Sequence, residues 1–399
     1  MNIEEIKQYI DSFSDYDIRS NKDCRFVDQK CTPDIVSFIA DCILCTSCAT
    51  KEFNINDLWK EEYFISNSMV IFGKPSPNNT DAHNEYNKVL VQPLKTLAYA
   101  HVLSVEKVKN TLYFRVQNTA LLEYIATRER NAYNFLLIFF KKVIYDSGLT
   151  RLFTEYETNC QDTNNIREAK SVIYEKYHRF ISANTPTQSK TDTDRMFHKV
   201  FNILNFEKGL PGSKCEILQW YDLMYNRINW RDTDKLKSET RKESIQNNQE
   251  RIREDFYIEY QVNKAIRLVK KVQGNISEVR DELSVGTATE VHHIFPKSMF
   301  PTIANYFENL ILLTSSQHRQ KAHPNGNTQL INSEYQYVCL MAKSKTIENY
   351  IQKFDETFYT KNNFIDVINT GYTEEQITDN NISFNNIRKY LTAYHNAHN

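Results

Sequence analysis

Glycine, proline and long apolar runs are all scarce in this 399-residue chain. It has 8 glycines and 9 prolines, which excludes collagen-like and low-complexity Pro/Gly-rich proteins. The densest apolar run, Phe135–Phe140, is far shorter than the roughly 20 residues of a membrane-spanning helix. The first residues are acidic and amphipathic and have no signal-peptide pattern. We therefore expect a cytoplasmic protein without a membrane partner.

The chain also lacks an excess of charge of either sign. Its 49 Lys and Arg residues nearly balance 50 Asp and Glu residues, which gives a formal net charge of −1. A protein that coats nucleic acid without specificity is usually strongly basic, because neutralising phosphates supplies most of its affinity. If this chain binds DNA, its positive charge must be gathered locally. A hydrophobic content of 41% is typical of a globular protein, and the length suits two or three domains.

Eight cysteines without a secretory signal indicate reduced thiols rather than disulfides. Cys42, Cys45 and Cys48 have the spacing of a zinc or iron–sulfur site, and Cys24 and Cys31 are near in sequence. They also fall on a predicted helix, where cysteine serves as a small apolar residue. Because no fourth ligand has a suitable spacing, we favour core packing over metal binding.

The N-terminal part is predicted to be mainly helical. Thr32 as N-cap, Pro33 and Asp34 begin a helix that periodic apolar residues extend to about Thr46. A short helix should start after Asn54. Further along, the patterns predict a strand at 111–116, helices at 121–130 and 134–146, and helices over 156–225 with a loop at 182–189 and a resumed helix at 193–204.

Residues 230–255 are rich in charges of both signs and poor in large apolar side chains. This composition favours a solvated helix or linker. The alternative is a basic segment that follows a DNA backbone, continued by Ala265–Lys271. From Glu334 onward, the pattern predicts two or three helices around a polar loop near 370–381.

Four of the ten histidines are concentrated in one short segment: His292, His293, His318 and His323. Their context predicts two strands followed by a short helix. The strands are 290–295 and 309–314, and Ser315 or Ser316 caps a helix that stops before a proline.

This segment, 287–327, resembles the HNH (ββα-metal) endonucleases, and its spacing is similar to that of the colicin-type nuclease domains. The resemblance implies a metal-dependent nuclease. His293 would be the general base that deprotonates a water molecule, and His292 and His318 would bind one divalent cation. Asn309, which opens the second strand, would tie the loop backbone together and orient the base.

The segment departs from the family pattern in three respects. Many HNH enzymes have Asp where His292 stands, and imidazole shifts the preference from Mg²⁺ towards Mn²⁺, Ni²⁺ or Zn²⁺. We expect Mg²⁺ or Mn²⁺ and leave Ni²⁺ and Zn²⁺ open. His323 follows His318 by five residues and so lies off the i, i+4 face of an α-helix. It can be the third ligand only if the helix unwinds. No structural-zinc Cys pairs flank the segment; the nearest cysteine is Cys339.

The N-terminal part also resembles bacterial HNH-type restriction enzymes. Four segments carry this resemblance: 25–35, 128–130, 195–200 and 225–232. It would assign residues 1 to about 230 to DNA recognition. Asp28 and Lys30 also have the Asp-x-Lys form of the other large class of restriction nuclease, although Pro33-Asp34 follows this pair instead of preceding it. We keep that class as a weaker alternative.

Taken together, the sequence predicts an α+β protein with a mainly helical N-terminal DNA-recognition region, a C-terminal ββα-metal nuclease module and a helical tail. We place the boundaries at 1–155, 156–254, 255–345 and 346–399. The favoured function is a type II restriction endonuclease that cuts double-stranded DNA as a homodimer. Such an enzyme implies a cognate DNA methyltransferase, without a stable complex. Lys297, Arg319 and Lys321 are candidate phosphate contacts.

Two other functions remain open at this point. One is a modification-dependent or defence-triggered HNH nuclease, although no Gly-rich phosphate loop favours binding of a signalling nucleotide. The other is a DNA-binding protein with a structural metal and no catalysis. A structural site needs four closed ligands, whereas a catalytic site leaves one position open beside a base.

Overall fold

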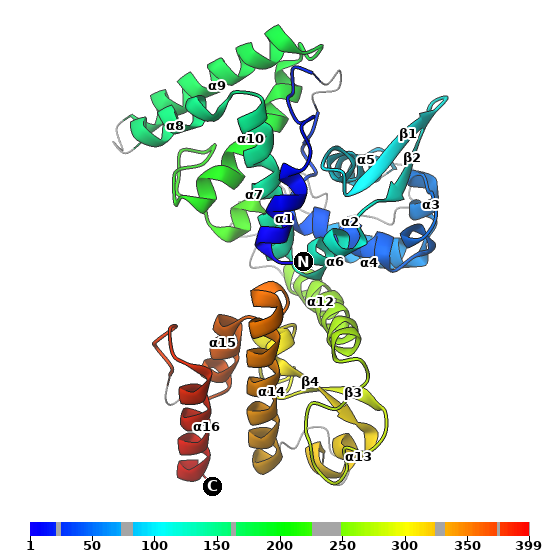
Figure 1. The fold of residues 1–399 in the computed structure, drawn as a ribbon, viewed down its shortest axis with the longest axis vertical. Helices are drawn as coiled ribbons and strands as arrows, with labels where there is room; N and C mark the ends of the chain where they lie inside the picture. Colours follow the sequence, from blue (N-terminus) through cyan, green and yellow to red (C-terminus); the bar gives the residue numbers. More distant parts are fainter. Residues whose placement is uncertain are drawn as a thin grey trace. The chain divides into compact units, whose positions relative to one another are not determined.

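The computed structural model describes residues 1–20, 25–72, 83–160, 165–225, 249–323, 332–372 and 376–398. The fold is α+β, with helices predominating and two small antiparallel sheets (Figure 1). The chain divides into two compact units, Ile3–Ser244 and Ile245–Asn399. Most of the charged segment predicted as a linker, 230–248, lies outside the described residues. Among those described, no helix is long and apolar enough to cross a membrane.

The first unit is built from helices and one β-hairpin. Its elements in chain order are α1 (Ile3–Asp11), α2 (Pro33–Leu44), the 3₁₀ turn η1 (Ser47–Ala49), α3 (Ile55–Trp59), α4 (Glu62–Phe72), α5 (His83–Tyr99), β1 (Leu103–Val108), β2 (Thr111–Val116), α6 (Thr119–Thr127), α7 (Glu129–Asp146), α8 (Thr150–Asn159), α9 (Ile166–Asn184), α10 (Lys190–Glu207) and η3 (Trp220–Leu223).

Helix α2 is at the centre of this unit and begins as predicted. Thr32 is its N-cap in extended conformation, Pro33 occupies the first turn, and almost every residue of the helix is buried. It packs against α6 and α7. Because a helix that is apolar on all sides must be surrounded, its composition fits this central position.

The cysteines of this region contribute to the core. Cys42 is buried in α2 and Cys48 is buried in η1. Among the described residues, the possible metal-binding groups of three or more side chains include no cysteine. The burial of Cys42 and Cys48 supports the predicted core packing. Cys24 lies outside the described residues.

Most predicted elements of the first unit are present with shifted ends. The strand at 111–116 is confirmed, and the short helix after Asn54 is α3 with Asn54 as its cap. The predicted helix at 134–146 starts earlier, at Glu129. The loop predicted at 182–189 begins only after α9 ends at Asn184.

The second unit combines one long helix, a two-stranded sheet and a helical tail. Its elements are α12 (Gln249–Gln273), β3 (Ala288–His293), the 3₁₀ turns η4 (Pro301–Ile303) and η5 (Phe307–Asn309), β4 (Leu310–Thr314), α13 (Ser315–Gln317), the π-helical turn η6 (His318–Ala322), α14 (Ser333–Phe354), η8 (Asp355–Thr357), α15 (Lys361–Gly371) and α16 (Phe384–His398). The prediction of two or three helices from Glu334 onward is thus confirmed by α14, α15 and α16.

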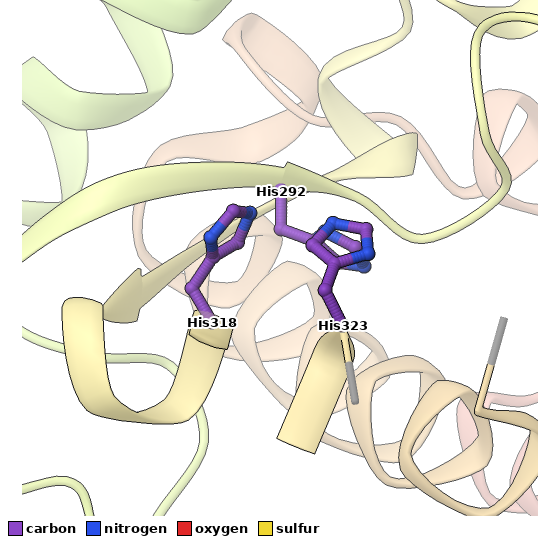
Figure 2. A group of neighbouring side chains, drawn as sticks. All are labelled: His292, His318 and His323. Carbon is purple, nitrogen blue, oxygen red and sulfur yellow. The ribbon is translucent and has the colours of Figure 1, made fainter. Parts of the chain in front are cut away.

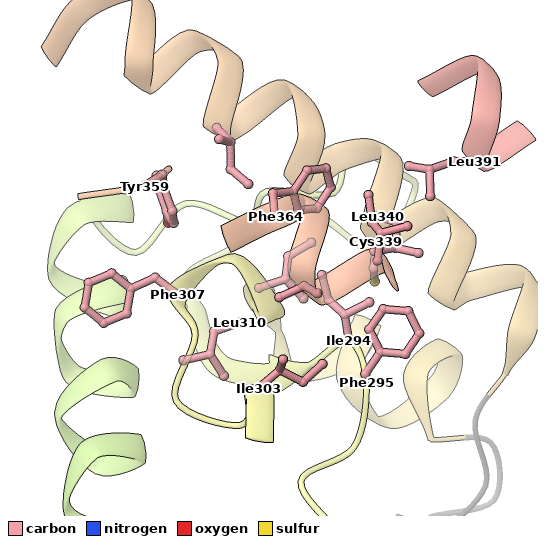
Figure 3. Packing of buried hydrophobic residues seen from close by; sticks show 14 of the residues in the cluster. Ile294, Phe295, Ile303, Phe307, Leu310, Cys339, Leu340, Tyr359, Phe364 and Leu391 are labelled. Atoms are coloured by element: carbon pink, nitrogen blue, oxygen red, sulfur yellow. The ribbon is translucent and has the colours of Figure 1, made fainter. Parts of the chain in front are cut away.

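One hydrophobic core holds this unit together (Figure 3). Strand β4 is buried along its whole length, as expected for a strand covered on both faces. Phe295, which follows β3, packs edge-on against Phe300 and Tyr372. At Gly371, a Cβ atom would overlap the Phe295 ring. The glycine therefore allows the end of α15 to approach the ring that anchors the segment after His293.

A buried ion pair joins the segment before β3 to helix α14. Lys343 Nζ lies 3.1 Å from a carboxylate oxygen of Glu278, and both side chains are essentially inaccessible to solvent. Lys343 also donates to the Tyr359 hydroxyl at 3.0 Å, and Glu278 accepts the backbone N–H of Leu312 at 2.9 Å. Because each charge has several partners, the network meets the condition for burying an ion pair.

Candidate metal centre

The sheet of the second unit positions the histidine pair. Strands β3 and β4 are antiparallel, with His292 opposite Ile311 and His293 opposite Leu310. Successive side chains of a strand point to opposite faces. Adjacent His292 and His293 therefore face different surroundings, and this separation allows them to have different roles.

The helix that carries His318 begins with a capping box. The side chain of Thr314 accepts the backbone N–H of Gln317, and Gln317 Oε1 accepts the backbone N–H of Thr314 at 3.0 Å. The prediction that Ser315 or Ser316 caps this helix was wrong by one or two residues. The T-x-x-Q pattern of a capping box was present in the sequence and would have found the correct position.

After this cap, the chain forms a π-helical turn, His318–Ala322. The backbone N–H of His323 donates to the carbonyl of His318 at 3.1 Å. A π-turn has its hydrogen bonds between residues five apart, so residues 318 and 323 lie on the same side of it. The sequence required a departure from α-helical winding to bring His323 beside His318, and the wider π-turn is such a departure.

Three imidazole rings converge from the strand and from the two ends of the π-turn (Figure 2). The ring centroids of His292, His318 and His323 are 5.4, 4.8 and 4.7 Å apart in the three pairs. One ligand nitrogen from each lies within 4.8 Å of the others. Since a metal ion binds imidazole nitrogens at about 2.0–2.1 Å, small side-chain rotations would allow all three to share one ion.

Burial keeps two members of this trio, His292 and His318, neutral. Burial lowers the pKa of His292 to about 3, with further lowering by the neighbouring His323, His318 and His293. Burial is also the main reason why the pKa of His318 is lowered. A metal ion binds the neutral imidazole, so at neutral pH these side chains are in the form that ligation requires.

His293 points away from the trio and into the loop between the strands. Its Nε2 lies 3.0 Å from the backbone carbonyl of Ala304. A carbonyl oxygen only accepts hydrogen bonds, so Nε2 carries the proton and Nδ1 carries the lone pair. Burial lowers the pKa of His293. The side chain is thus a neutral imidazole, oriented by a main-chain acceptor, with Nδ1 able to accept a proton.

Asn309 is fully buried and ties this loop together. Its Oδ1 accepts the backbone N–H of Phe295 at 2.8 Å, and its Nδ2 donates to the carbonyls of Phe295 and Ile303 at 3.0 and 3.2 Å. Ala304, the residue after Ile303, provides the carbonyl that His293 Nε2 contacts. The bonds of Asn309 therefore hold the loop that carries the carbonyl facing His293.

Sequence reasoning missed Gln317, which is buried and directly precedes His318. Its Nε2 donates to the carbonyl of Val279 at 3.1 Å and to Asp281 at 2.8 Å, and its Oε1 accepts from Ser277 at 2.6 Å. These bonds fix the helix of His318 to the segment before β3. Glu290 was missed as well; it accepts a hydrogen bond from Ser315 and raises the pKa of His318, against the larger effect of burial.

The three basic side chains that the sequence offered as phosphate contacts differ in environment. Lys297 and Arg319 are exposed. Lys321 forms an ion pair with Glu282 at 2.6 Å, so a phosphate would have to compete with that carboxylate. Lys297 and Arg319 are therefore the stronger candidates.

Among the residues that the structure describes, the carboxylates near the Asp-x-Lys pair form no possible metal-binding group of three. Lys30 is buried and forms an ion pair with Glu85 at 2.9 Å and a hydrogen bond to the Tyr225 hydroxyl at 2.6 Å. Both carboxylate oxygens of Asp34 accept the backbone N–H of Tyr225 at 3.0 Å. Lys30 and Asp34 thus bind Tyr225 through these hydrogen bonds, and this role is structural.

Comparison with known protein families, curated proteins and solved structures finds no match to this chain.

Proposed function

We propose that this protein is a metal-dependent endonuclease of the HNH type that cleaves double-stranded DNA. The observation that carries the proposal is the separation of roles between adjacent histidines. His292 belongs to a group of three histidines suited to a metal ion, while His293 faces a backbone carbonyl that fixes its tautomer. Phosphodiester hydrolysis needs both an electrophilic centre and a base.

In this proposal, His293 begins the reaction. Its Nδ1 accepts a proton from a water molecule, whose oxygen attacks the phosphorus atom. The bond from phosphorus to the 3′ oxygen then breaks, and the departing oxygen takes a proton from solvent, which leaves a 5′ phosphate and a 3′ hydroxyl. His293 returns its proton to solvent before the next reaction. The lowered pKa of His293 supports this role, because the imidazole is unprotonated before the attack.

His292, His318 and His323 would hold the metal ion. When bound, the ion supplies positive charge to the phosphate and to the departing oxygen. A set of nitrogen ligands favours Mn²⁺, Ni²⁺ or Zn²⁺ over Mg²⁺. Among the described residues, three side chains form this group, which fits a catalytic site with an open position better than a closed structural site of four ligands.

The finer assignment is a type II restriction endonuclease. The first unit, with its own core and more than half of the chain, supports this assignment, because a nuclease without sequence preference needs little beyond the ββα module. Cutting both strands of a symmetric site calls for two active sites, so we propose a homodimer. A nuclease activated by DNA modification or by a defence signal is the second candidate.

Incubation of the purified protein with plasmid DNA tests the proposal. Chelated protein should be inactive, and added Mn²⁺ should restore cleavage at least as well as Mg²⁺. Sequencing the fragment ends should reveal a common motif and 5′ phosphates. Cleavage after exhaustive chelation would contradict the metal site, while metal-dependent fragments with random ends would support a nuclease but not a restriction enzyme.

A matched pair of DNA substrates distinguishes a restriction enzyme from a nuclease that depends on DNA modification. The same plasmid is prepared from a strain without DNA methyltransferases and after methylation in vitro. A restriction enzyme cuts the unmodified plasmid. Cleavage confined to methylated plasmid would establish dependence on modification instead.

A further inference from the structure

The β-hairpin of the first unit is exposed to an unusual degree. The seven consecutive residues from Ser104 to Asn110 are all exposed, and two of them are valines with 47% of their surface accessible. The ribbon extends away from the helices of its own unit (Figure 1). A two-stranded ribbon in water is only marginally stable by itself, so an exposed one calls for a reason.

The base of the hairpin is well anchored. Phe114 is buried, forms backbone hydrogen bonds with Phe53 at 2.9 and 2.7 Å, and lies with its ring centroid 6.0 Å from that of Phe53. Leu103 is buried as well. The anchoring residues alternate with exposed ones, so one face of the ribbon packs on the unit near its base and the other faces outward.

The register identifies the residues of the outward face. Cross-strand pairs share a face, and Ser104 pairs with Arg115, Glu106 with Tyr113, and Val108 with Thr111. Five of these six side chains can form hydrogen bonds. A face that packed against a protein core would be apolar instead, so the outward face is suited to a polar partner.

Charge and size indicate which polar partner fits. Within residues 103–116, Lys107, Lys109 and Arg115 oppose a single carboxylate, Glu106. Each strand has six residues, which gives a length of about 20 Å. The major groove of B-DNA, about 12 Å wide and 8.5 Å deep, admits a two-stranded ribbon.

We propose that this hairpin enters the major groove of double-stranded DNA and is a sequence-reading element of the protein. Arg115 reads base edges from the outward face, close to the anchored base of the ribbon. Lys109, in the turn, and Lys107, on the opposite face, contact phosphates. The inference rests on the proposed nuclease function, since it names the element that selects the site which the nuclease cuts.

The test uses the full chain with His293→Ala, so that DNA is bound without being cut. Selection from a pool of random duplexes gives the preferred sequence. The affinity of each variant is then measured for that duplex and for a scrambled one, at several salt concentrations. Arg115→Ala should lower the preference for the selected duplex by about 10-fold or more, because one base contact is removed.

Lys109→Ala should behave differently. It should weaken binding to both duplexes alike and reduce the slope of log affinity against log salt by about one, as expected for loss of one phosphate contact. Arg179→Ala, in α9, serves as the matched control, because it removes an exposed arginine (79% accessible) far from the hairpin in sequence. It should leave the preference unchanged.

Unchanged affinity and preference in both hairpin variants would overturn the proposal, and would point to a protein partner for the ribbon. If the wild-type protein cuts plasmid DNA at a motif and the hairpin variants bind DNA normally, the hairpin inference is wrong but the proposed function stands. If the wild-type protein neither cuts nor binds duplex DNA, both the proposed function and the hairpin inference are wrong. Circular dichroism of each variant confirms that the fold is intact.

Discussion

The backbone N–H of His323 donates to the carbonyl of His318 at 3.1 Å, and this bond closes a π-turn. In an α-helix, residue 322 would occupy the position one turn after His318, but that residue is alanine. The wider turn brings the histidine five residues later next to His318. The third candidate ligand therefore depends on the type of one helical turn.

Removal of Gln320 tests this relationship. The two histidines would then be four residues apart, which suits an ordinary α-turn. We expect the shortened protein to bind Mn²⁺ within a few-fold of the wild type, whereas His323→Ala should bind it at least 10-fold more weakly. Isothermal titration calorimetry on chelated protein measures both. Equal affinities of His323→Ala and wild type would exclude His323 as a ligand.

His293→Ala should abolish DNA cleavage while specific DNA binding stays within a few-fold, since the base does not hold the duplex. The loss in rate should be 100-fold or greater, as is typical of a general base. Single-turnover cleavage and a gel-shift assay with the same duplex provide the measurements. A variant that cuts at nearly the wild-type rate would remove His293 from the mechanism.

Asn309→Ala should reduce both stability and activity. The substitution leaves the backbone N–H of Phe295 and the carbonyls of Phe295 and Ile303 without their partner in a buried place. We expect a loss of about 2–5 kcal/mol in the free energy of unfolding. Urea denaturation at 25 °C measures it, and Asn362→Ala, at an exposed position of α15, is the matched control.

Lys343→Met should destabilise the protein by about 3–5 kcal/mol, because it leaves the carboxylate of Glu278 buried without its cation. The double variant Glu278→Gln/Lys343→Met should recover much of this loss, since glutamine can still accept the N–H of Leu312. Urea denaturation compares the three proteins. A double variant as unstable as the single one would show that the ion pair is not the source of the effect.

Acidification should destabilise the metal-free protein. The pKa of His292 is lowered to about 3 in the folded state, from about 6.5 in an unfolded chain. Stability is therefore complete above pH 6.5 and falls as the pH decreases towards 3, because the unfolded state then binds more protons. His292 alone contributes a loss on the order of 2 kcal/mol at pH 5.

Thermal unfolding of chelated protein between pH 7.5 and pH 5 checks this expectation. His292→Asn should lose less stability over that range than the wild type, because it has no proton to bind there. Identical pH profiles of the two proteins would contradict the burial of His292 as the cause.

The sequence by itself determined the local structure around the site. Local patterns predict two strands, found at 288–293 and 310–314, and the short helix after them. These patterns are the spacing of apolar residues, the position of Pro296 and the polar residues before His318. The candidate ligands His292 and His318 and the residue Asn309 came from the resemblance of this segment to the HNH pattern. These features depend on residues near one another in the chain, so local physical rules suffice for them.

Only the tertiary structure decided how those residues meet. The spacing between His318 and His323 conflicts with α-helical periodicity, and a π-turn becomes favourable only where packing supports it; here Gln317, buried against Val279 and Asp281, fixes the start of the turn. The tautomer of His293 depends on the carbonyl of Ala304, eleven residues away. These contacts join segments that are separate in the sequence, and no local pattern specifies such a distance.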